Sequence, residues 1–189
     1  MDNEIAEKFM KILEKQGLNF KLGHAVESTK IIGNKVILSI RNVAKENIEE
    51  IDADVVLVAV GRKPNTNGLG LKDLNIDVDK QGFIRTNNDF QTSINNIYAI
   101  GDVIKGPMLA HKAEEDGVAA VEIINGEAGH VDYNLVPGII YTSPEVAVIG
   151  KTEEELKNHG IVFNKGVFPL SANSRAKAIS HTDGMVKIL

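Results

Sequence analysis

The sequence predicts an α/β chain with additional antiparallel strands. Two short, continuous apolar runs, at residues 54–61 and 96–101, are typical of strands that are covered on both faces. A helical pattern of small residues follows the second run closely, at residues 108–125. Strands that alternate with helices in this way indicate a sheet packed against helices.

The chain begins with a predicted amphipathic helix at residues 3–16. Its apolar residues recur at the i, i+4, i+7 and i+8 positions, namely Ile5, Phe9, Ile12 and Leu13. Gly17 follows and suits the position just after a helix. The pattern therefore predicts both the helix and its end.

Strands are predicted next. Two strand-like runs, at residues 19–26 and 35–40, flank the turn signal Gly33-Asn34, and a polar stretch follows them. Residues 54–61 read DVVLVAVG, which predicts a buried strand rather than a half-exposed one.

The middle of the chain contains the most distinctive order of elements. Residues 68–94 mix glycine, asparagine and short apolar pieces, and we predict a crossover without a helix. A short buried strand at residues 96–101, a turn and a helix at residues 108–125 follow. Pro107 suits the start of this helix and Gly126 its end.

The last part of the chain is predicted to contain short strands and a short helix. Residues 141–150 contain a strand, and residues 152–155, TEEE, fit a capping box at the start of a helix that ends near Gly160. Residues 185–189 predict a final strand.

Composition excludes several classes of function. The net charge is −5, without a basic cluster, which argues against a nucleic-acid partner. No apolar run approaches the roughly 20 residues of a membrane span, so we expect a soluble intracellular protein without a membrane partner. The absence of cysteine removes thiol redox chemistry from these 189 residues.

Asp102 is the first candidate site residue. A carboxylate just past a strand can accept hydrogen bonds from sugar-alcohol hydroxyls, and Gly101 lets a ligand approach the backbone. The first amides of the next helix, near Leu109 and Ala110, lie at the positive end of its dipole and can stabilise negative charge. Taken alone, the Gly-Asp pair more often forms a simple Asx-turn before an ordinary helix.

The same residues resemble the flavin-binding signature of the pyridine nucleotide-disulfide oxidoreductases, T-x-x-x-x-I-Y-A-x-G-D, which residues 92–102 match. Residues 54–66 are similar to the last strand of the family's NAD domain, and residues 141–156 to the start of its interface domain. The resemblance covers nearly the whole chain, in the family's order. It implies partial Rossmann-like FAD- and NAD-binding domains and the start of an α+β dimerisation domain.

The resemblance also implies roles for individual residues. Asp102 would hold the ribityl chain of FAD, and Gly61 would approach the bound nucleotide of NAD. The flavin's pyrimidine edge would meet main-chain amides of one turn, which consists of Met108, Leu109, Ala110 and His111.

Within the family, residues 108–117 and 168–177 are most similar to the dihydrolipoamide dehydrogenases. This resemblance implies electron flow from dihydrolipoamide to a cysteine pair, then to FAD and to NAD. The cysteine pair and the family's His-Glu pair lie outside these residues, so we expect an internal segment that is inactive alone. The alternatives are a sibling reductase that acts on glutathione or mercuric ion, and a non-catalytic interaction module.

The resemblance further implies three segments and a set of partners. Residues 1–66 would belong to the NAD domain, 67–130 to the crossover and FAD domain, and 131–189 to the interface domain. We expect a homodimer that serves the lipoyl domains of 2-oxo acid dehydrogenase complexes. Its location would be the cytoplasm, or the mitochondrial matrix in a eukaryote.

Other chemical patterns are weaker. The Gly-Leu-Gly at residues 68–70 lacks the third glycine, strand and helix of a dinucleotide fingerprint. The histidines other than His111 lack metal-ligand spacing. Residues 114–116, Glu-Glu-Asp, point different ways around a helix, and we interpret them as a solvated face.

Overall fold

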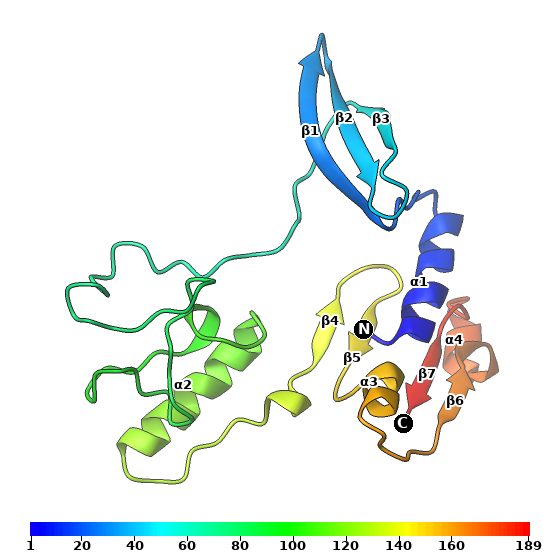
Figure 1. The fold of residues 1–189 in the computed structure, drawn as a ribbon. Helices are drawn as coiled ribbons and strands as arrows, with labels where there is room; N and C mark the ends of the chain where they lie inside the picture. The colour runs from blue at the N-terminus through cyan, green and yellow to red at the C-terminus, as the bar shows by residue number, and fades with distance from the viewer. The chain divides into compact units, whose positions relative to one another are not determined.

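The computed structural model describes residues 1–189, and Figure 1 shows its helices and short antiparallel strands. No helix is both long and apolar enough to cross a membrane. The α-helices and strands are α1 Asn3–Lys15, β1 His24–Ile32, β2 Lys35–Asn42, β3 Ile48–Ala53, α2 Ala110–Ile124, β4 Gly138–Ile140, β5 Val146–Val148, α3 Glu153–Asn158, β6 Gly166–Pro169, α4 Ser174–Ala178 and β7 Met185–Ile188.

The chain divides into two compact units, one of residues 7–61 and one of residues 1–6 with 62–189. The first unit contains most of α1 and an antiparallel sheet with the strand order β1-β2-β3. The predicted helix at 3–16 and the second strand of the hairpin are confirmed. The prediction of a strand from residue 19 was wrong, because Gly23 has a positive φ of +68° and β1 begins only at His24.

Strand β3 was not predicted, and its sequence explains why. It reads IEEIDA and is half exposed, so its polar residues hid it within a polar stretch. Strand β3 pairs with β2 along its whole length, from Val36 opposite Ala53 to Arg41 opposite Ile48.

The prediction of a buried strand at residues 54–61 was wrong for this chain. These residues form no strand, and Val55, Leu57 and Val60 are 83%, 87% and 92% exposed. A strand is defined by its ladder of hydrogen bonds, and no other segment of the chain pairs with this one. The apolar run is therefore exposed along its length.

The second unit has a core between the crossover segment and α2. The core residues are small or aliphatic apart from Phe90, and they are Ile76, Ile84, Phe90, Ala99, Ile104, Ala119 and Ala120. The crossover has no helix, as predicted, and is held by isolated bridges such as Ile84 with Ile104.

The strand predicted at residues 96–101 is absent. Within this range only Tyr98 makes a β-bridge, and its partner is Gln91. Side-chain and backbone hydrogen bonds hold this segment in place of a strand ladder. The Thr92 hydroxyl donates to the Ile97 carbonyl at 2.8 Å, and the Ala99 amide donates to the Phe90 carbonyl at 2.9 Å. The spacing from threonine to isoleucine in the signature thus closes a loop that turns the chain toward Asp102.

Helix α2 begins at Ala110, two residues later than predicted, and Gly126 follows its end with a φ of +85°. Its small residues allow the close approach that the sequence predicted. A Cβ at Gly101 would lie 3.1 Å from the Ala113 Cβ. The helix therefore packs directly against the backbone that precedes Asp102.

The remaining elements include three confirmed predictions: strand β5, the capping box of α3 between Thr152 and Glu155, and strand β7. Strands β4 and β5 pair with each other, as do β6 and β7. The Lys187 side chain of β7 is 3% exposed and pairs with Asp2 at 2.8 Å and with Glu153 at 2.6 Å. Charged groups from both ends of the chain therefore meet in one cluster.

Candidate functional site

Asp102 lies in a single turn of 3₁₀ helix, Gly101–Val103, that follows extended backbone at Ile100. Gly101 has a φ of +71°, which glycine adopts readily and other residues rarely. The Asp102 side chain is 44% exposed, and its Oδ2 pairs with Arg62 Nη1 at 3.1 Å. Its Oδ1 accepts no hydrogen bond from the protein, so this carboxylate can accept one from a ligand.

Arg62 connects both ends of the turn. One guanidinium nitrogen pairs with Asp102, and the other donates to the Met108 carbonyl. The sequence predicted Arg62 only as part of an exit turn. Its planar fork suits two acceptors at once, and here it holds residues 102 and 108 together.

The start of α2 presents unpaired donors. Its N-cap, Leu109, makes no side-chain cap, and the amides of Ala110, His111 and Lys112 have no protein acceptor. The Met108 carbonyl, one turn before Lys112, is occupied by Arg62 instead. These amides lie at the positive end of the helix dipole, where negative charge is stabilised.

The His111 ring is held by a contact with the protein backbone. Its Nε2 lies 2.9 Å from the Pro137 carbonyl oxygen. Because a carbonyl only accepts, Nε2 carries the proton in this contact. His111 can therefore offer a ligand its main-chain amide while its ring stays anchored.

The fit to FAD can be judged from these groups. FAD offers hydroxyls on its ribityl chain and an electron-rich pyrimidine edge on its ring. The turn supplies a half-exposed carboxylate for the hydroxyls and free amides for the edge. The donor set therefore fits the cofactor that the signature implies.

A buried ion pair lies beneath the turn. The side chains of Lys112 and Asp116 are fully buried, with Lys112 Nζ 2.7 Å from Asp116 Oδ2. The prediction of a solvated face at residues 114–116 was therefore wrong for Asp116, although Glu114 and Glu115 are exposed. The helix rotates Asp116 inward, where Lys112 one turn earlier compensates its charge.

Tyr133 completes this cluster. Its hydroxyl donates to Asp116 Oδ1 at 2.8 Å, and Lys112 Nζ lies 5.0 Å from the centre of its ring. Burial and the hydrogen bond to Asp116 raise the pKa of Tyr133 well above its usual range, so it remains a donor. The i, i+4 spacing of Lys112 and Asp116 was the only sequence signal for the pair, and it is common on exposed helix faces.

Gly61 is the last residue of the other unit. Its φ is +100°, and no atom lies within 4 Å of where a Cβ would be. The glycine is thus required by backbone conformation, and its surroundings leave room for a ligand to approach.

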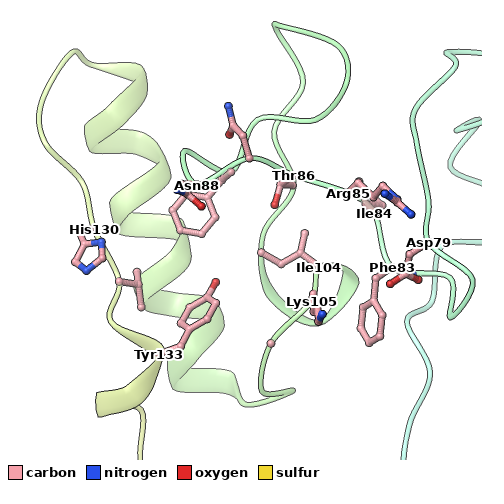
Figure 2. A pocket seen from close by; sticks show the side chains of 14 residues that line it. Asp79, Phe83, Ile84, Arg85, Thr86, Asn88, Ile104, Lys105, His130 and Tyr133 are labelled. Carbon is pink, nitrogen blue, oxygen red and sulfur yellow. The ribbon is translucent and has the colours of Figure 1, made fainter. Parts of the chain in front are cut away.

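A hollow of about 970 Å³ lies elsewhere in the second unit. Figure 2 shows His130 and Tyr133 on one side of it and Phe83 and Arg85 on the other. None of the six predicted site residues lines it, and a second hollow of about 330 Å³ includes only Leu109 among them. The donor groups of the turn, rather than the size of a hollow, identify the candidate site.

Two family models match the chain. The model described as pyridine nucleotide-disulphide oxidoreductase matches residues 1–117, and the dimerisation domain of the same family matches residues 136–189. The chain belongs to the pyridine nucleotide-disulphide oxidoreductase family. It contributes Rossmann-like parts and the start of the dimerisation domain.

Among curated relatives, the chain is similar to dihydrolipoyl dehydrogenases. It is 52% identical over 189 residues to the mitochondrial enzyme of Pisum sativum and 53% identical over 190 residues to that of Homo sapiens. It is also 52% identical to a leghemoglobin reductase of Glycine max. All of the chain is covered, but only 38%, 37% and 36% of these relatives.

Solved structures share the fold. The HOCl-induced flavoprotein disulfide reductase RclA from Escherichia coli has a TM-score of 0.86 at 26% identity, over 98% of this chain and 42% of that chain. LpdA from Mycobacterium tuberculosis has a TM-score of 0.88 at 24% identity, over 99% and 40%, and supports the fold alone.

Proposed function

We propose that the whole protein that carries these residues is a dihydrolipoamide dehydrogenase, which oxidises dihydrolipoamide to lipoamide with NAD as acceptor. One observation carries the proposal. A half-exposed carboxylate and free helix amides form a flavin-type turn in a chain 52% and 53% identical to two dihydrolipoyl dehydrogenases.

The residues of the turn would bind and orient the cofactor. When bound, FAD supplies a two-electron carrier between a dithiol and NAD. Asp102 accepts hydrogen bonds from ribityl hydroxyls, and Arg62 holds its carboxylate in place. The free amides of Ala110 and His111 would donate toward negative charge on the flavin's pyrimidine edge. The Leu109 amide, which the sequence also suggested, already donates to the Pro107 carbonyl at 3.0 Å.

Met108 and Gly61 would act through the backbone. The Met108 carbonyl, held by Arg62, sets the path of the chain into α2. Gly61, with its positive φ and open surroundings, lets the nicotinamide nucleotide approach the main chain.

The 189 residues would supply cofactor contacts, but they contain no cysteine and therefore no thiol. We therefore propose that the dithiol chemistry occurs outside this segment, and that the segment alone neither binds flavin stably nor turns over. The proposed division into residues 1–66, 67–130 and 131–189 assigns NAD, FAD and dimer contacts in that order.

The partners follow from the same assignment. The match to the dimerisation domain supports a homodimer. We propose that the dimer accepts electrons from lipoyl domains of 2-oxo acid dehydrogenase complexes, in the cytoplasm or, like the named mitochondrial relatives, in the mitochondrial matrix.

Substrate competition tests the proposal. The purified whole protein would be assayed with dihydrolipoamide and NAD, with glutathione disulfide and NADPH, and with mercuric ion and NADPH. We expect turnover only in the first pair. Turnover with either NADPH pair would favour a sibling reductase, and a folded protein without flavin or turnover would favour a non-catalytic module.

A further inference from the structure

We propose that Lys112 and Asp116 are positioning residues for FAD, which act by clamping the backbone of Gly101 and thereby fixing the Asp102 carboxylate relative to the free amides of α2. This inference rests on the proposed flavin site. The buried Lys112–Asp116 pair takes no direct part in the proposed reaction, and the inference gives it a structural role in the flavin site.

The pair holds Gly101 at both of its peptide groups. Asp116 Oδ2 accepts from the Gly101 amide at 3.0 Å, and Lys112 Nζ donates to the Gly101 carbonyl at 3.1 Å. That carbonyl belongs to the peptide plane that continues into Asp102. Because both peptide planes of Gly101 are held, the position of the Asp102 Cα, from which the carboxylate extends, is also held.

The same pair lies on the helix that supplies the amides. Lys112 and Asp116 occupy the first two turns of α2, directly after Ala110 and His111. The clamp thus joins the carboxylate and the amides, which would hold two different parts of FAD, in one fixed geometry. A site that must bind a long ligand at two points benefits from such a link, because less freedom is lost on binding.

The cluster is closed on every side. No buried side-chain nitrogen or oxygen lacks a hydrogen-bond partner, and Tyr133 supplies the third contact of Asp116. A Cβ at Gly106 would lie 3.1 Å from Lys112 Cε and 3.3 Å from the Tyr133 ring. The turn between Gly101 and Gly106 therefore wraps tightly around the ammonium group.

Stability alone does not explain such a pair. Burying two charges carries a large desolvation cost, and apolar side chains of similar volume often stabilise a protein equally well or better. A pair that remains fully buried while it contacts both sides of one glycine is better suited to fixing a backbone than to strengthening a core.

The experiment compares three variants of the whole protein. Asp116→Asn keeps an oxygen that can accept from the Gly101 amide but leaves Lys112 charged without a counterion, so it removes the charge and not this hydrogen bond. The double variant Lys112→Met/Asp116→Leu removes both charges and the clamp but keeps the apolar volume. Lys35→Met, which breaks the exposed Lys35–Asp52 pair between β2 and β3, is the matched control.

Three readouts separate positioning from folding: the melting temperature, the Kd of the flavin-free protein for FAD, and hydrogen exchange at the Gly101 amide. We expect the double variant to melt at a lower temperature than the wild type, because the Gly101 amide and carbonyl lose their partners, but to remain folded at the temperature of the binding assay. Its Kd for FAD rises about tenfold or more, and Gly101 exchanges at least about tenfold faster, because a charge-assisted hydrogen bond is lost. The control changes none of the three.

A double variant with wild-type FAD affinity and wild-type visible circular dichroism of the bound flavin would overturn the inference while the flavin site stands. Unchanged exchange at Gly101 would overturn it as well. A wild-type protein that binds no FAD would refute the proposed function first, and the positioning role with it.

Discussion

Replacing Asp102 by alanine in the whole protein weakens FAD binding without unfolding the protein. The Asp102 carboxylate is 44% exposed and meets only the exposed Arg62, and such surface pairs contribute about 0–1 kcal/mol. A charge-assisted hydrogen bond to a ribityl hydroxyl contributes about 1.5–3 kcal/mol. Since about 1.4 kcal/mol is tenfold in affinity, the Kd for FAD rises between roughly tenfold and roughly 100-fold.

The assay is fluorescence titration of the flavin-free protein with FAD, together with thermal unfolding. Asp102→Asn keeps the shape but not the charge, and its Kd lies between those of the wild type and the alanine variant. Asp89→Ala removes another exposed loop carboxylate and leaves the Kd unchanged. Wild-type affinity in Asp102→Ala would refute the assignment of this residue to the cofactor.

Three further outcomes are expected. Gly61→Ala raises the KM for NAD more than that for dihydrolipoamide, and equal shifts in both constants would indicate a folding defect instead. Gly17→Ala, at a glycine with a φ of +97° against +100° and equally open surroundings, changes neither constant. The 189-residue chain, once purified, is colourless and self-associates through its exposed apolar residues 55–60, so a yellow or strictly monomeric preparation in light scattering would contradict this prediction. Burial opposes ionisation of Asp2, but hydrogen bonds from Lys187 and from backbone amides outweigh it and lower the pKa of Asp2. The ionised Asp2 therefore stabilises the fold fully above about pH 4–5, and this stabilisation is lost as the pH falls. We expect Lys187→Met to melt at a lower temperature than the wild type at pH 7, and this difference to become smaller in acid. A difference that stays constant from pH 7 to 3 would contradict the prediction.

Local patterns predicted those elements whose stability is local. The helix at 3–16, the capping box at Thr152 and the helix that ends before Gly126 each depend on neighbours in sequence, and each is present. The signature around Asp102 was also recognisable, because its Thr92 and Ile97 close a loop although they are only five positions apart in the sequence.

Predictions failed where an element depends on distant partners. Residues 54–61 have the composition of a central strand, but a strand needs neighbours, and none lies within this chain. The prediction for Asp116 was wrong in the opposite sense, because this residue was expected to be exposed and is buried. Its burial depends on Lys112, Tyr133 and the Gly101 backbone together, and three-dimensional packing brings the latter two to α2.

The most direct test of the flavin assignment is a crystal structure of the whole protein with FAD bound. We expect an Asp102 carboxylate oxygen within about 2.5–3.0 Å of a ribityl hydroxyl. The free amides of Ala110 and His111 should point at the pyrimidine edge of the flavin ring. A structure in which FAD is bound away from Asp102, with the start of α2 facing only solvent, would contradict the account.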